Sequence, residues 1–147
     1  MGFRFRFEAL LKYRLHRKER AEVELGRARK RLNQARERLG ALQKRRQEAG
    51  KELQVALKGR ASANLLQGHA DFVTAFEGRI QSQKEEVDRC RDDVRDRVKT
   101  VLDRTREVQV VEKLQEKDHQ TWIQEEQRKE QKTLDEIAVI RHGRAFS

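Results

Sequence analysis

The stretch LKYRLHRKERAEVELGRARKRLNQARERLGALQKRRQEAGKELQVAL (residues 11–57) decides the fold, because its apolar residues recur every seven positions. One row consists of Leu25, Leu32, Leu39 and Leu53, and the second of Ala21, Ala28, Ala35, Leu42, Ala49 and Ala56. The rows interleave in steps of four and three, which is the a/d spacing of a coiled coil. A single helix cannot bury so narrow a stripe, so the stretch predicts a long helix that needs a partner.

The second half of the chain offers that partner. Its β-branched residues also recur every seven positions, at Ile80, Val87, Val94, Val101 and Val108. An antiparallel hairpin lets the chain close its own seam through a short connection. The predicted fold is therefore all-α, an elongated antiparallel two-helix coiled-coil hairpin that forms a single domain over residues 1–147. A homodimer of open chains is the competing arrangement.

The boundaries of this hairpin follow from its composition. We expect the first helix over residues 8–58 and the second over residues 79–140, with an arm at 1–7 and a loose tail at 141–147. Residues 59–78 contain three glycines and are predicted to be a bend with one or two short helices. With Leu57 level with Arg79, the numbers of paired residues add to about 136. The arm would then meet the last twenty residues at one tip.

Charge dominates the composition, since 41% of the residues are charged and the net charge is +10. Residues 1–60 carry 19 Lys and Arg against 7 Asp and Glu, whereas residues 61–147 carry 16 against 18. This asymmetry favours pairing of the first segment with the second over pairing with itself, although salt screens exposed charges beyond about 8–10 Å. A basic coiled coil that binds nucleic acid is the alternative function. Binding of nucleic acid is disfavoured because acidic residues interleave with the basic ones and no aromatic residues that could stack on bases accompany them.

The sequence contains no motif of a known catalytic site, so we expect neither an enzyme nor a cofactor. A Gly-rich phosphate loop, GxSxG and HExxH are all missing. The four histidines are scattered, and a facing pair of His16 and His119 would not complete a metal site. Cys90 is predicted to be a small hydrophobic residue near the seam. One cysteine and no apolar run of about 18–20 residues predict a cytosolic protein without a membrane span.

Two apolar clusters are candidates for binding a partner. In the arm, Phe3, Phe5 and Phe7 alternate with arginines, which predicts an extended segment with an aromatic face. These rings either dock on a neighbouring helix or bind a partner or an acidic membrane surface. In the bend, Phe72, Val73 and Phe76 lie within about one helical turn. They either plug the end of the coil or form an exposed recognition patch.

Both ends of the chain resemble the flagellar export protein family FliJ. The opening FRFRFEALLKYR (residues 3–14) is similar to the start of that family, through Phe3, Phe5, Phe7, Glu8, Leu10, Leu11 and Arg14. The segment QRKEQKTLDEIAVIRHGR (residues 127–144) is similar to its C-terminus, through Glu130, Lys132, Leu134, Asp135, Glu136, Ala138 and Arg141. The length and the helical character match along the whole chain, whereas residues 59–78 have no clear counterpart.

This resemblance implies a component of the flagellar type III protein export apparatus, and hence a role in motility. Members of the family form a two-helix coil similar to the stalk of rotary ATPases. They associate with the export ATPase FliI and the export-gate protein FlhA, and they help to recycle export chaperones. The resemblance thus implies a cytoplasmic location at the inner face of the inner membrane, reached through partners. An unrelated stalk of a rotary ATPase is a third hypothesis.

On this hypothesis, two surfaces carry the function. The tip that engages the ATPase would combine Phe3, Phe5 and Phe7 with Leu134, Ile137 and Arg141. The bend, with Phe72, Val73 and Phe76, would be available to the gate.

Overall fold

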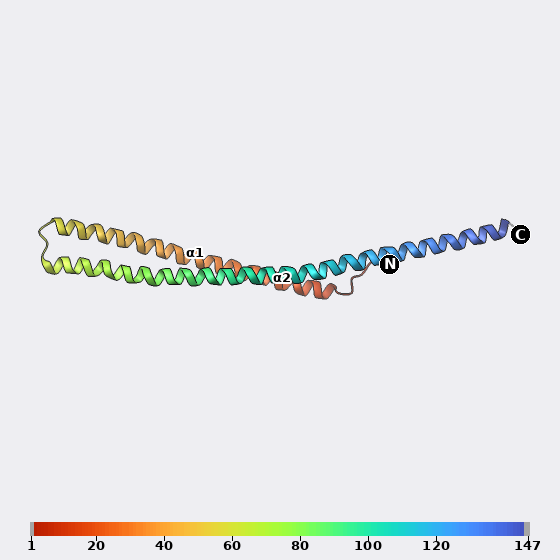
Figure 1. Cartoon of the computed structure of the whole chain (residues 1–147), viewed down its shortest axis with the longest axis horizontal. Helices are drawn as coiled ribbons and strands as arrows, with labels where there is room; N and C mark the ends of the chain where they lie inside the picture. The colour runs from red at the N-terminus through yellow and green to blue at the C-terminus, as the bar shows by residue number, and fades with distance from the viewer. Residues whose placement is uncertain (1, 146–147) are drawn as a thin grey trace. The chain divides into compact units, whose positions relative to one another are not determined.

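Two helices make up the fold in the computed structural model, which describes residues 2–145 (Figure 1). Helix α1 spans Glu8–Lys58, and helix α2 spans Ala63–Ala145. The helices run side by side in opposite directions (Figure 1), so the predicted all-α antiparallel two-helix hairpin is confirmed. Helix α1 has the bounds that the heptad pattern predicts.

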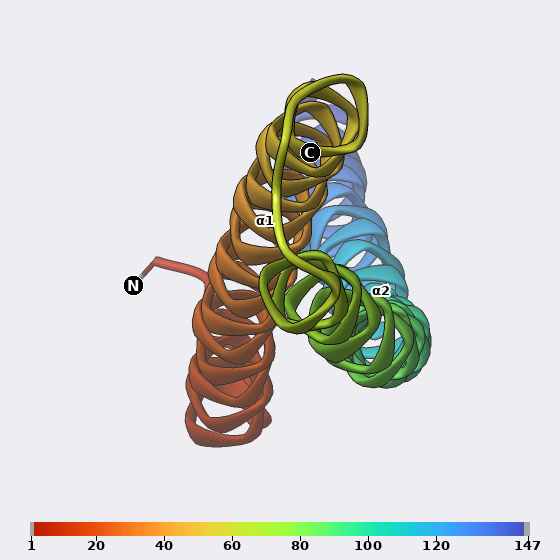
Figure 2. The same cartoon turned by 90° about the vertical axis from the view of Figure 1, so that its left-hand side faces the viewer.

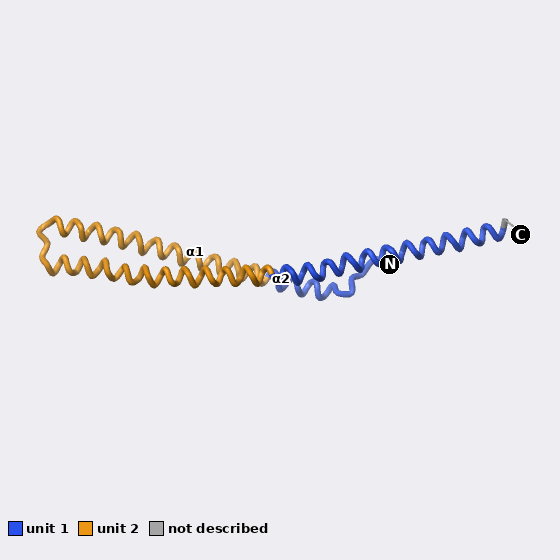
Figure 3. Tube along the Cα trace, viewed as in Figure 1, with its two compact units in different colours: residues 1–19, 103–147 blue, residues 20–102 orange. Residues whose placement is uncertain are grey.

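Contacts divide the chain into two units, each built from parts of both helices (Figure 3). Unit 2 consists of residues 20–102 and contains the end of the hairpin where the chain reverses. Unit 1 consists of residues 1–19 and 103–147 and contains the arm and the end of α2. The prediction that residues 1–147 form one domain stays a prediction.

The connection between the helices is much shorter than predicted. Helix α2 begins at Ala63, not at residue 79, so the bend comprises residues 59–62 rather than 59–78. The predicted separate short helix is the first part of α2 itself. The tail was also predicted wrongly, because α2 continues past residue 140 to Ala145, while residues 146–147 lie outside the described residues.

A cap at Ser62 explains where α2 begins. The backbone N–H of Leu65 donates to Ser62 Oγ at 3.2 Å, and the N–H of Leu66 donates to the carbonyl of Ser62 at 3.0 Å. A serine in this position satisfies amide groups that the first helical turn leaves without partners. Gly68 and Gly78, which seemed to interrupt the pattern, lie inside α2 with open space where a Cβ would stand. They lower helix propensity there without ending the helix.

The core of unit 2 is the seam that the heptads predict. From α1 it takes Ala21, Leu25, Ala28, Leu32, Ala35 and Ala49, all buried. From α2 it takes Phe76, Ile80 and Val87. Leu32, Ala35 and Val87 form a cluster against which Leu39, Cys90 and Val94 pack. Cys90 is thus the small seam residue that the sequence predicts.

The same seven-residue spacing extends further back in α2 than we recognised from the sequence. Counting down from Ile80 leads to Val73 and then Leu66, and both side chains are half-buried. Between Val73 and Ile80 lies Phe76, which is only 2% exposed. The heptad row thus continues through the segment that was predicted to be a bend, in agreement with the early start of α2 at Ala63.

Ion pairs across the hairpin show the register of the two helices. In unit 2, Arg31 Nη1 lies 3.5 Å from Asp93 Oδ2, and Arg46 Nη2 lies 2.8 Å from Glu77 Oε1. The two residue numbers add to 124 in the first pair and to 123 in the second. The predicted sum of about 136 is therefore wrong by about twelve residues, roughly 18 Å along a helix. The short connection is the cause.

Unit 1 keeps a similar register through contacts around Glu107. Arg14 Nη1 donates to the carbonyl of Glu107 at 2.8 Å, and Arg17 Nη1 lies 3.2 Å from Glu107 Oε2. Phe5, Val108 and Val111 are buried in this unit. Arg14 lies seven residues before Ala21 and therefore in the same seam row, and its guanidinium donates to the backbone of the facing helix.

Crosslinking of introduced cysteines tests the observed register. In a Cys90→Ser background, the pair Arg46→Cys and Glu77→Cys should join through a short bismaleimide, because these positions face each other. The control is Arg46→Cys alone with the native Cys90, which would be level with position 46 in the originally predicted register. Position 90 lies thirteen residues from position 77, about 20 Å along α2. Crosslinking of the control within one chain, without crosslinking of the first pair, would contradict the structure.

Candidate partner-binding surfaces

The N-terminal arm packs with its aromatic face on α2. Phe5 is buried, and Phe3 and Phe7 are half-buried, whereas Arg4 and Arg6 are exposed. This alternation is the one that the sequence predicts. Of the two alternatives for the arm, the structure agrees with the first, in which the phenylalanine rings dock on a neighbouring helix.

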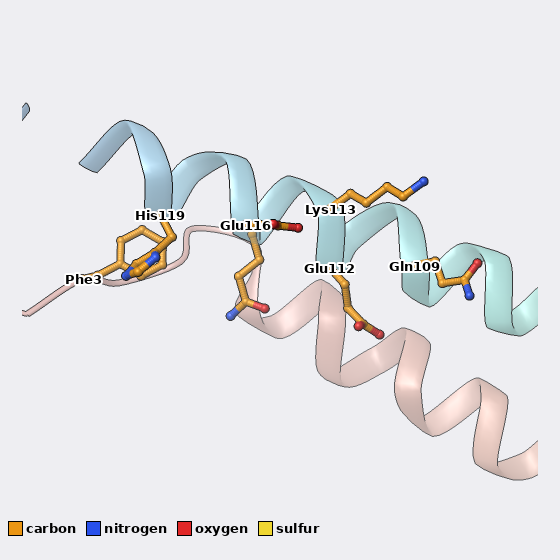
Figure 4. A pocket seen from close by; sticks show the side chains of 7 residues that line it. Phe3, Gln109, Glu112, Lys113, Glu116 and His119 are labelled. Atoms are coloured by element: carbon orange, nitrogen blue, oxygen red, sulfur yellow. The ribbon is translucent and has the colours of Figure 1, made fainter. Parts of the chain in front are cut away.

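Specific contacts hold the arm at residues 118–122 of α2. The ring of Phe3 meets that of His119 edge-on at 4.9 Å between centroids and lies 6.0 Å from that of Trp122. Such ring pairs contribute about 0.5–1.5 kcal/mol beyond the area they bury. Arg6 Nε lies 3.6 Å from Asp118 Oδ2, an exposed ion pair of small energetic value. Beside Phe3, a shallow polar hollow follows α2 back to Gln109 (Figure 4).

The predicted single tip of arm and C-terminus is wrong. The arm contacts His119 and Trp122, whereas Leu134, Ile137 and Arg141 lie further along α2 and are exposed. Twelve residues of helix separate Trp122 from Leu134, about 18 Å. The error follows from the register, since α1 and its arm reach a level on α2 about twelve residues earlier than predicted. The facing pair of His16 and His119 is wrong for the same reason, because His119 meets Phe3.

The last part of α2 is exposed on all sides. Every side chain described from Gln127 to Arg144 is exposed, including Leu134 at 60% and Ile137 at 42%. Leu134, Ile137 and Arg141 are spaced by three and four residues, so they share one face of the helix. The hydrogen bond from Gln131 Nε2 to Asp135 Oδ1, at 2.9 Å, lies within this stretch of α2. This part of α2 presents an apolar stripe to solvent.

The three residues of the cluster predicted in the bend differ in exposure: Phe76 is buried, Val73 is half-buried and Phe72 is exposed. Phe76 is buried, and the guanidinium groups of Arg45 and Arg79 lie 5.8 and 5.5 Å from its ring centroid. Phe72 meets Phe76 edge-on at 4.9 Å and is 51% exposed. Phe76 was therefore wrongly grouped with exposed residues, because it occupies the seam. Phe72 and the half-buried Val73 remain accessible.

An apolar surface that the sequence did not single out surrounds the end of the hairpin. Val55, Leu57 and Leu65 are exposed there, and a shallow hollow runs from Glu52 past Leu65 to Phe72. Both Val55 and Leu57 lie in the predicted first helix, and Leu57 was expected to lie level with Arg79, the predicted start of the second helix. The sequence could have indicated their exposure, since neither Val55 nor Leu57 belongs to the a/d rows that form the seam.

Neither a metal site nor an activated nucleophile is visible in the part of the chain that the structure describes. Within residues 2–145, no group of three or more His, Cys, Asp or Glu side chains could hold a metal ion. Burial raises the pKa of the Cys90 thiol, and the neighbouring Glu86 carboxylate raises it further. A raised pKa disfavours the thiolate, which is the reactive form. Cys90 therefore has a packing role.

Many of the basic residues are engaged with carboxylates. Arg27 pairs with Glu24 within α1, and Arg31 pairs with Asp93 across the hairpin. The Arg89 guanidinium, through a hydrogen bond and its charge, lowers the pKa of the Glu86 carboxyl. Alternating charges of this kind weaken the positive surface that phosphate binding requires.

In residues 2–145, neither α1 nor α2 contains a stretch long and apolar enough to span a bilayer.

Comparisons with known proteins place this geometry in context. The family model described as "Flagellar FliJ protein" matches residues 3–146. A solved structure, described as that of a putative YscO homolog, CT670, from Chlamydia trachomatis, is similar at 19% sequence identity and a TM-score of 0.55. The match covers 96% of each chain, and at this identity it supports the fold alone. No curated protein matches the chain.

Fluorescence of the single tryptophan tests the docking of the arm. Truncating a buried phenylalanine costs about 3–5 kcal/mol in a core, enough to release an arm held by few contacts. We therefore expect Phe5→Ala to raise the acrylamide quenching of Trp122, which is half-buried next to Phe3. The exposed Arg4→Ala variant is the control and should leave quenching unchanged. Equal quenching after deletion of residues 2–7 would show that the arm does not cover this part of α2.

Proposed function

The chain belongs to the FliJ family and is a component of the flagellar type III export apparatus, and we propose that it couples the export ATPase to the export gate. It would do so by binding, without catalysis of its own. The observation that carries this proposal is the end of α2, where the described side chains from 127 to 144 are exposed and include an apolar stripe. The proposed partners are the ATPase FliI, the gate protein FlhA and the export chaperones.

The ATPase surface is proposed to lie on α2 near its end. Leu134 and Ile137 expose apolar side chains on the face that also carries Arg141. Helices that bind in grooves or rings commonly use apolar residues at such spacing as contacts. The arm lies elsewhere on α2, so its phenylalanines are assigned a packing role rather than a share in this surface.

Substitutions on the two faces of this helix test the ATPase surface. The double variant Leu134→Asp and Ile137→Asp should weaken binding to the ATPase at least tenfold. Burial of one such side chain is worth about 1.5–3 kcal/mol, and about 1.4 kcal/mol corresponds to a tenfold change. Val139→Asp is the matched control, because Val139 is exposed and lies about 200° around the helix from Ile137. Unchanged affinity after deletion of residues 134–147 would refute the proposal.

The gate surface is proposed to lie beside the hairpin end, at Phe72 and Val73. Phe72 is exposed and rests on the buried Phe76, so its ring is held in place on a rigid helix. Exposed aromatic residues supported in this way are frequent energetic centres of protein interfaces. Phe76 would act through Phe72, since it has almost no surface of its own.

Binding to the cytoplasmic part of the gate protein tests this second surface. Phe72→Ala should reduce affinity about tenfold or more, because loss of a central aromatic contact commonly costs about 2 kcal/mol. Thr74→Ala is the control, since Thr74 is exposed on α2 and its hydroxyl bonds only to the carbonyl of Ala70. If Phe72→Ala binds the gate as tightly as the control, the gate surface lies elsewhere.

Chaperone recycling and location are the remaining parts of the proposal. Binding to export chaperones would use apolar residues that the hairpin leaves uncovered. A cytoplasmic location at the inner face of the inner membrane would follow from attachment to the ATPase and the gate. The family assignment supports both statements.

A further inference from the structure

The end of the hairpin has a composition unlike the rest of this chain. Residues 53–70 (LQVALKGRASANLLQGHA) contain no Asp or Glu, although the whole chain has 25 of them among 147 residues. The same segment carries Lys58 and Arg60. Its net charge is therefore +2 with His69 neutral. We refer to residues 53–70 as the hairpin end; Figure 2 looks onto it.

Exposed apolar side chains surround this hairpin end. Val55 is 72% exposed, Leu57 is 60% exposed and Leu65 is 54% exposed. Val55 and Leu57 are two positions apart on α1, so they point in directions about 200° apart. Leu65 lies on the other helix, in the first turn of α2. A peptide bound in a groove would cover one of these directions, whereas a surface that surrounds the end would cover them all.

The depth of these residues matches the interface of a lipid bilayer. Val55 lies four residues before Gly59, the first residue after α1, which is about 6 Å along the axis. Amphipathic elements bury their apolar side chains about 5–10 Å into the boundary between headgroups and acyl chains. The first acidic side chains, Glu52 and Asp71, lie further back, about 10 Å and 13 Å from the connection. They would stay outside at this depth.

The cations at the hairpin end are placed to meet headgroups. Lys58 is in the last turn of α1 and Arg60 is in the connection, and both are exposed. Their long side chains can keep the charges at the lipid phosphates while their aliphatic stems lie against apolar surface. Ser62, at the end of the connection, accepts hydrogen bonds from the amides of Leu65 and Leu66 and so caps the first turn of α2.

From this juxtaposition we propose that the hairpin end binds directly to an anionic phospholipid bilayer, inserting Val55, Leu57 and Leu65 while Lys58 and Arg60 contact phosphate. Charge complementarity favours an anionic surface, and the distribution of apolar residues around the end favours a bilayer over an acidic protein. The inference goes beyond the proposed function, in which the membrane is reached only through protein partners. It concerns a surface separate from the ATPase surface. Phe72, the residue proposed to bind the gate, borders the same shallow hollow as Leu65 but lies outside residues 53–70.

Vesicle binding by the full-length protein tests the proposal without any partner. The probes are vesicles of phosphatidylcholine alone and vesicles that also contain phosphatidylglycerol. We expect binding to the anionic vesicles only, and a loss of about tenfold or more for Lys58→Glu with Arg60→Glu, since each cation near such a surface contributes roughly a kcal/mol. Because the net charge of +10 alone favours anionic surfaces, the matched control is Arg29→Glu with Lys30→Glu. This control changes charge equally in an exposed part of α1 and should bind clearly better.

Insertion is measured separately from adsorption. In a Cys90→Ser background, an environment-sensitive fluorophore at Leu65→Cys should shift to the blue on anionic vesicles, and one at the exposed Val23→Cys should not. Circular dichroism of every variant verifies that the helices are retained. Three results would overturn the proposal: no preference for anionic vesicles, equal losses in both charge variants, or no shift at position 65. If the hairpin-end variants lose only affinity for the gate protein, the surface binds an acidic protein instead. The ATPase and gate tests of the proposed function use other variants, at Leu134, Ile137 and Phe72, so their results do not depend on vesicle binding.

Discussion

The apolar seam between α1 and α2 is the interaction on which the rest of the structure depends. It is narrow, because small alanines on α1 meet larger residues on α2, and the buried side chains that the structure describes are all apolar. Two helices that share one narrow seam leave most side chains in contact with solvent. The hollows beside Phe3 and beside Leu65 are shallow and open to solvent. Function in such a protein must come from the surfaces that the seam leaves uncovered.

The position of the seam along each helix is decided at a few atoms near the connection. Ser62 caps α2 so early that the chain reverses within residues 59–62. This sets the level at which every later residue of α2 meets α1, through pairs such as Arg46 with Glu77. A shift of about twelve residues changes no side chain, yet it moves the arm from the neighbourhood of Leu134 to His119 and Trp122. The same shift leaves the end of α2 uncovered.

The candidate surfaces differ in how they arise from this arrangement. The stripe of Leu134 and Ile137 is exposed because α1 and the arm lie against earlier parts of α2. The ring of Phe72 is exposed because the heptad places Phe76, four residues later, in the seam. The apolar residues of the hairpin end are exposed because residues outside the a/d rows near a chain reversal have no helix beside them. Each surface is therefore a consequence of packing elsewhere.

The sequence by itself determined the class of fold, the bounds of α1, the two rows of the seam and the resemblance at both termini. These features are local or periodic, and periodicity can be counted along one chain. It also determined the packing of Cys90 and the alternation of the arm. Only the tertiary structure decided where α2 starts, the register of the two helices, and which apolar residues stay exposed. The glycines at 68 and 78 lower helix propensity, but packing of Leu66, Val73 and Phe76 against α1 outweighs that local cost. Register depends on where a chain reverses, and that depends on the balance between local propensity and burial, which the order of residues alone does not reveal.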